Sequence, residues 1–194
     1  MQYHASVIRL FQPFTTYEPT AEGIRFYHDQ ALTRTSIAVK ELRQLIFQND
    51  HYHGWAVTIT IVLHPIVVTV FGSLDEIAQQ DQPPQYIVET NEAYRGLLTC
   101  LRALSIISTY NFYAQPLFRL LAQSCQGLHI PLPVEVVAML DSYQSEAWTK
   151  NAASMVSSQY IADMRKAATG MENARMDSVV SRWDALVLTD EGKK

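Results

Sequence analysis

The feature that most constrains this chain is an apolar run from Trp55 to Phe71, broken only by threonines, His64 and Pro65. A membrane-spanning helix needs about 20 predominantly apolar residues. This run is shorter, contains an ionisable histidine and has no basic flanks, so a buried core segment is favoured over a membrane span. Its valine, isoleucine and threonine content leaves a strand open. Helical spacing decides for a helix, because apolar residues recur at Trp55, Ile59, Val62 and Ile66.

Composition places the chain among folded globular proteins. Hydrophobic residues make up 48% of its 194 positions and charged residues 18%, which excludes intrinsic disorder and suits one domain with a substantial core. The formal net charge is −4. A freestanding nucleic-acid binder is usually basic, so we expect no direct DNA binding by this chain. The start of the chain has no basic stretch before an apolar one, so we expect an intracellular protein without a secretory signal.

Helical periodicity recurs on both sides of the central run. In the first segment Tyr3, Val7 and Leu10 share one face, widened by Ile8 and Phe11, and Pro13 is expected to end the helix. Residues 15–27 are predicted to form a loop. Asp29 is expected to cap the next helix, which is predicted to end at residues 49–51.

Three further helices are predicted after a polar, proline-containing loop at residues 79–85. The first includes residues 94–104, and we expect it to pack on the central helix through Leu97, Leu101 and Leu104. The second covers residues 111–126, with Gly127 as the C-terminal cap. The third covers residues 134–143. No convincing hairpin appears, so the predicted fold is all-α: an irregular multi-helix bundle without significant β-sheet. We divide it into a body, residues 1–143, and an amphipathic helical tail, residues 144–194.

The chemical residues give little support for a catalytic or metal site. Cys100 and Cys125 lie in apolar, helix-like contexts and are predicted to be buried hydrophobes, too few for a four-thiolate zinc site. His51 and His53 are one residue apart, but they are expected at a helix end, where histidine suits the negative end of the dipole. His64 is interpreted as a core histidine. We therefore predict no catalytic, cofactor-binding or metal residues, and no enzyme.

Nucleotide and nucleophile motifs are also missing. The sequence contains neither a Gly-x-Ser-x-Gly elbow nor a phosphate-binding loop. Asp75, Glu76 and Asp81 do not form the paired aspartate-rich motifs that a helical isoprenoid enzyme needs.

Five segments occur in a recognisable order. They are Met1–His4 with Val7–Phe14, Ile37–Ile46, Trp55–Leu74, Leu98–Leu104, and Leu117–Leu121 with Gly127–Pro133. In this order they resemble the later helices of the fungal-specific transcription factor domain, the "middle homology" region of fungal binuclear zinc-cluster regulators. The family ends the first of these helices with a Leu-His-Arg-Pro-Phe-like stretch, where this chain has Phe11-Gln12 in place of His-Arg.

The resemblance implies a non-catalytic regulatory fragment in the nucleus, the C-terminal part of such a domain. Members carry six clustered cysteines that hold two zinc ions and read DNA, and this chain has two cysteines. Its expected partners are proteins, or the remaining part of the transcription factor, with a small-molecule effector as a further candidate. The alternative interpretation is a small helical ligand-binding protein or enzyme with a pocket near Trp55, His64 and Tyr110.

Overall fold

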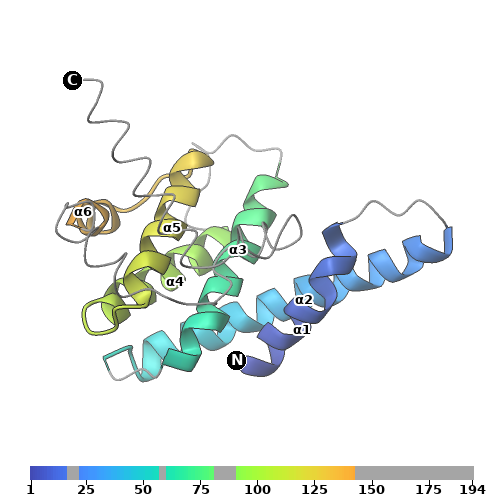
Figure 1. Ribbon diagram of the computed structural model, residues 1–194, viewed down its shortest axis with the longest axis horizontal. Helices are drawn as coiled ribbons and strands as arrows, with labels where there is room; N and C mark the ends of the chain where they lie inside the picture. The colour runs from blue at the N-terminus through green and yellow to red at the C-terminus, as the bar shows by residue number, and fades with distance from the viewer. Residues whose placement is uncertain (17–21, 57–59, 81–90, 143–194) are drawn as a thin grey trace.

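A computed structural model describes residues 1–16, 22–56, 60–80 and 91–142 (Figure 1). These residues form six α-helices and one short 3₁₀ helix, with no strand among them, which confirms the all-α prediction. In chain order the elements are α1 (Gln2–Thr16), α2 (Glu22–Tyr52), η1 (Thr60–Val62), α3 (Leu63–Ala78), α4 (Glu92–Ser108), α5 (Ala114–Gly127) and α6 (Val134–Ser142).

Helices α3 to α6 form a body around the larger of two hydrophobic clusters. Helix α3 packs on α4, α4 packs on α5, and α6 contacts both α4 and α5. Leu97, Leu101 and Leu104 of α4 lie in this cluster with Ile66 and Val70 of α3. The predicted contact between the central apolar helix and the leucines of the next helix is therefore confirmed.

Helices α1 and α2 form an arm that extends from this body (Figure 1). They pack against each other, and a second hydrophobic cluster joins them to α3. That cluster contains Ala5 and Ile8 of α1 together with Val68 of α3 and the following residues of α2: Ala38, Val39 and Leu42. The outer ends of α1 and α2 lie beyond the body, so this part of the arm does not pack against α3 to α6 (Figure 1).

Two glycines lie at the contact between the arm and the body. A Cβ atom on Gly72 of α3 would lie 2.6 Å from Val39 Cγ2, and one on Gly96 of α4 would lie 2.7 Å from Arg43 Cδ. Real Cβ atoms do not approach other atoms this closely. The missing side chains therefore allow α2 to lie directly against α3 and α4, as small residues allow close helix packing.

The central helix begins later in the chain than predicted. Trp55 precedes it, residues 57–59 lie outside the described residues, and α3 runs from Leu63 to Ala78. Pro65 then falls in the first turn, where a missing backbone N–H is tolerated. Thr60–Ala78 is long and apolar enough by length and composition to cross a membrane, and 61% of its most apolar window is buried inside the fold. A buried core helix has the same composition, as the sequence interpretation expected.

Two predictions about the arm were wrong. Pro13 does not end the first helix, because α1 continues to Thr16 and the Thr15 hydroxyl donates to the Gln12 carbonyl oxygen at 2.9 Å. Asp29 does not cap the second helix, because α2 begins at Glu22 within the predicted loop. Packing of α1 along α2 provides tertiary contacts that lengthen a helix beyond its local signals.

The end of α5 also differs from its prediction. His129, not Gly127, adopts the left-handed conformation, with φ of 54°. The Ile130 N–H donates to the Cys125 carbonyl oxygen and the His129 N–H donates to that of Gln126, each at 2.9 Å, which is the Schellman arrangement. Helix α6 confirms the predicted short helix. The tail predicted over residues 144–194 lies outside the described residues, as does most of the loop predicted at 79–85.

Candidate functional site

The structure brings together two of the three residues proposed to surround a pocket. The Tyr110 hydroxyl donates a hydrogen bond to the backbone carbonyl oxygen of Trp55, and the Trp55 indole N–H donates to Asp50 Oδ1 at 2.8 Å. The Trp55 side chain is 1% exposed and belongs to the main hydrophobic cluster. These contacts fix the chain segment after α2 against the end of α4, which is a structural role.

His64, the third residue, lies in the first turn of α3 and is half-buried. Burial lowers the pKa of His64 below its ordinary value of 6.5, and the positive charge of Arg9 on α1 lowers it further. A neutral imidazole at this position is consistent with the predicted core histidine.

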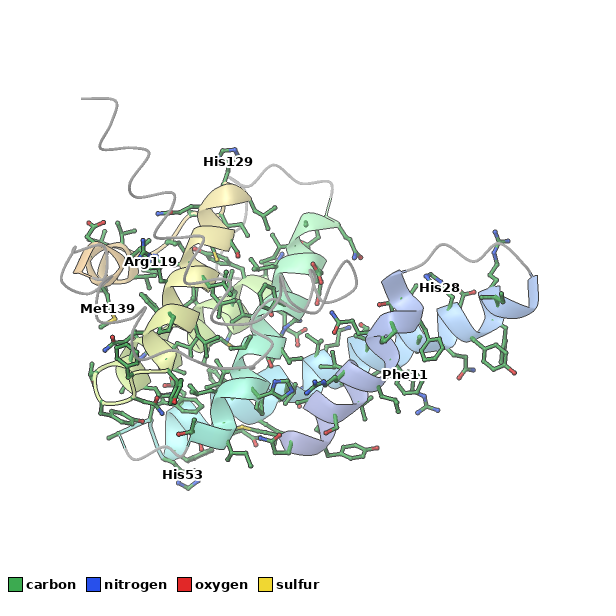
Figure 2. All side chains as sticks on the ribbon, in the orientation of Figure 1. Phe11, His28, His53, Arg119, His129 and Met139 are labelled. Carbon is green, nitrogen blue, oxygen red and sulfur yellow. The ribbon has the colours of Figure 1, made fainter. Side chains whose placement is uncertain are left out.

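The remaining histidines considered from the sequence do not form a metal site in the described part of the chain. His51 and His53 are both exposed at the end of α2, and the ring of His51 stacks on Phe47 with centroids 6.3 Å apart. Figure 2 shows His53 and His129 pointing outward at opposite ends of the body. Among the described residues no three His, Cys, Asp or Glu side chains are grouped so that they could hold a metal ion.

Both cysteines are buried, as predicted, and neither forms a disulfide. Burial raises the pKa of the Cys100 thiol to about 12, although the nearby charge of Arg43 acts in the opposite direction. A thiol with so high a pKa is almost entirely protonated near neutral pH and is a poor nucleophile. Cys100 therefore packs in the core as an apolar side chain.

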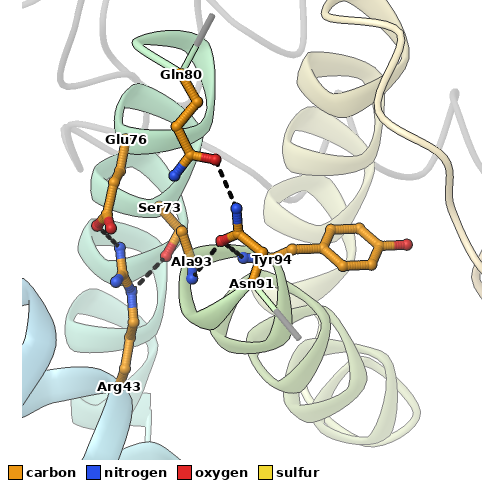
Figure 3. Close-up of polar contacts among 7 residues, drawn as sticks. All are labelled: Arg43, Ser73, Glu76, Gln80, Asn91, Ala93 and Tyr94. Carbon is orange, nitrogen blue, oxygen red and sulfur yellow. Dashed lines mark hydrogen bonds and ion pairs between the residues drawn. The ribbon is translucent and has the colours of Figure 1, made fainter. Parts of the chain in front are cut away.

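A buried arginine lies where α2, α3 and α4 meet. Arg43 is 4% exposed. Its Nε donates to Ser73 Oγ at 3.0 Å, and its Nη2 forms an ion pair with Glu76 (Figure 3). Its Nη1 is buried and has no hydrogen-bond partner in the structure. Burying a guanidinium costs free energy unless it is paired, so the ion pair with Glu76 is needed to offset the cost of burying Arg43.

The N-terminus of α4 is fixed beside this arginine. Asn91 caps the helix by accepting hydrogen bonds from the backbone N–H groups of Ala93 and Tyr94, at 2.9 and 3.2 Å. Its side-chain amide also donates to Gln80 Oε1 beyond the end of α3 (Figure 3). This contact holds the first turn of α4 against the last turn of α3 and so keeps Gly96 over the stem of Arg43.

A groove of about 170 Å³ lies between α2 and α4 next to Arg43. Its lining residues come from these two helices: Arg43, Gln44 and Phe47 from α2, and Glu92, Arg95, Gly96 and Thr99 from α4. No residue of this set was selected from the sequence. The sequence signal for this site was Arg43, an arginine within an apolar helical face. Such an arginine does not by itself indicate a groove.

The second candidate surface is an apolar stripe on the outer face of α1. Tyr3, Leu10 and Phe14 are spaced so that they follow one face of the helix, with partly buried Val7 between the first two. Their exposed fractions are 73%, 66% and 57%. Of the face predicted from the sequence, Tyr3 and Leu10 are thus turned to solvent, whereas Ile8 is buried together with Ala5 and Val7 packs partly against the same cluster. We call Tyr3, Leu10 and Phe14 the α1 stripe.

Comparisons of the chain with family models, with curated proteins and with solved structures gave no match.

Proposed function

We propose that this chain is a non-catalytic regulatory part of a fungal zinc-cluster transcription factor and acts in the nucleus through protein contacts. The ordered sequence segments that resemble the middle homology region support this assignment. The all-helical fold is compatible with it. With two cysteines and a net charge of −4, the chain itself is not expected to bind DNA.

The observation that carries the proposal of protein contacts is the exposure of the α1 stripe. Burying a large apolar side chain stabilises a protein by about 1.5–3 kcal/mol relative to leaving it in water. Three such side chains aligned on one helix face are therefore a favourable surface for association, whereas scattered exposed apolar residues need no explanation.

The partner proposed for this stripe is an amphipathic helix from the remaining part of the transcription factor. Apolar residues at intervals of three and four would place its anchors against Tyr3, Leu10 and Phe14. Helix α1 contains no Asp or Glu and carries the exposed Arg9, so its side-chain charge is positive. Charge complementarity then favours an acidic partner helix.

A reporter assay tests this function. The chain is fused to a foreign DNA-binding domain, and reporter output is compared among the wild type, Leu10→Asp and the control Gln48→Asp. Leu10 and Gln48 are both exposed helical residues, so the two variants add the same charge without disturbing the core. We expect the wild-type fusion to change reporter output, Leu10→Asp to abolish the change, and Gln48→Asp to retain it.

Two results would overturn the proposal. The first is a wild-type fusion, expressed at normal level, that leaves reporter output unchanged. The second is an equal effect from the wild type and Leu10→Asp, which would remove the α1 stripe from the regulatory contact.

A further inference from the structure

The volume of the groove between α2 and α4 limits the size of the ligand that it can hold. Its volume of about 170 Å³ is below the range of about 300–1,000 Å³ that is usual for drug-sized molecules. A ligand that fits must therefore be compact.

Arg43 is the buried charged residue among those that line this groove. It lines the groove while its side chain is more than nine-tenths buried, and its Nη1 lacks a hydrogen-bond partner. Leaving a buried charged donor unsatisfied costs more than leaving a neutral one. Since a carboxylate accepts strong, charge-assisted hydrogen bonds from a guanidinium, an acceptor of this kind placed in the groove removes that cost.

The other lining residues narrow the class of ligand. Arg95 adds a positive charge at the rim, and Glu92 adds a negative one. Arg43 is already paired with Glu76. These four groups together carry no net charge, so a ligand with one negative charge is repelled less by the two glutamates than a doubly charged phosphate is. The half-exposed ring of Phe47 and the bare backbone of Gly96 provide an apolar wall.

We propose that this groove binds a small monocarboxylate with an apolar body. The carboxylate accepts a hydrogen bond from Arg43 Nη1, which a small shift of the arginine side chain presents to the groove, and the apolar body lies against Phe47. Arg95 attracts the ligand from the rim. This site is separate from the α1 stripe and does not depend on the function proposed above.

Titration followed by NMR tests the proposal, with benzoate as the probe and benzamide as its uncharged counterpart. We expect benzoate to shift the backbone amide signals of Gln44 and Gly96 in a saturable way, and benzamide to shift them much less. Arg43→Lys keeps the charge but removes Nη1, and we expect it to weaken benzoate binding by about tenfold, the loss of one charge-assisted hydrogen bond.

Two further variants keep the test decisive if Arg43→Lys unfolds the chain. Arg95→Gln and Phe47→Ala change groove residues that are exposed, and each should weaken benzoate binding. The control Arg25→Gln removes a positive charge near the far end of α2 and should leave binding unchanged. Absence of saturable shifts, equal binding of benzamide, or unchanged binding in both Arg95→Gln and Phe47→Ala would overturn the proposal.

Discussion

Gly72→Ala tests the contact between the arm and the body. The new Cβ would lie 2.6 Å from Cγ2 and 3.1 Å from Cγ1 of Val39. Valine has one strongly preferred side-chain rotamer in a helix, so Val39 cannot turn away. Overpacking of this kind costs about 1–3 kcal/mol, and the better helix propensity of alanine returns about 1 kcal/mol. Because the contact is very short, we expect a net loss of about 1–2 kcal/mol.

Thermal unfolding followed by circular dichroism measures this loss. For a chain of this size it corresponds to a fall in Tm of roughly 2–8 °C. In a Val39→Ala background the obstructing methyl groups are gone, and Gly72→Ala should become neutral or stabilising, with a coupling free energy of about 1 kcal/mol or more. Gly54→Ala is the control: Gly54 has φ of +66° and nothing near its missing Cβ, so alanine should cost about 1–2 kcal/mol of backbone strain whatever residue 39 is. Additive effects of Gly72→Ala and Val39→Ala would refute the close packing of α2 on α3.

Three further predictions concern the core and its titratable groups. Leu101→Ala should lower the free energy of unfolding by about 2–5 kcal/mol in a denaturant titration, because Leu101 is fully buried, and a loss below about 1 kcal/mol would contradict its place in the core. The pKa of His64 is lowered in the folded chain, so the unfolded chain takes up a proton first as the pH falls. The free energy of unfolding should therefore be unaffected by His64 above pH 6.5 and should decrease as the pH falls below that value. The Tm of His64→Gln should depend less on pH in this range. An unchanged pH dependence would show that protonation of His64 is not its cause. Cys100 and Cys125 should react with a thiol reagent only after denaturation, and rapid labelling of the native chain would show that they are not buried.

Helix type and core membership could be predicted from the sequence where periodicity and burial agree. The leucines of α4 recur at spacings of three and four, and they lie in the main cluster. The proline and glycine signals were less reliable. Pro13 lies inside α1, where packing of the helix on α2 offsets the cost of a proline, and His129 takes the cap position that glycine usually occupies.

The candidate sites could not be predicted in the same way, because they depend on which face of a helix meets a neighbour. Tyr3 and Leu10 are as apolar as the residues that pack, and only the position of α2 shows that Ala5 and Ile8 are the buried ones. Arg43 is one of several charged residues in α2. Its burial follows from the absence of a side chain at Gly96, which is fifty-three positions further along the sequence.

The accessibility of the α1 stripe tests most directly the proposal that this surface contacts a protein partner in the nucleus. A Leu10→Cys variant offers one exposed thiol, since both natural cysteines are buried, and its rate of reaction with a maleimide can be compared between the purified chain and intact nuclei. Gln48→Cys, exposed on α2, is the matched control. We predict that Cys at position 10 reacts quickly in the purified chain and much more slowly in nuclei, while the control reacts quickly in both. Slow labelling in the purified chain, or equally fast labelling in nuclei, would contradict the proposed contact.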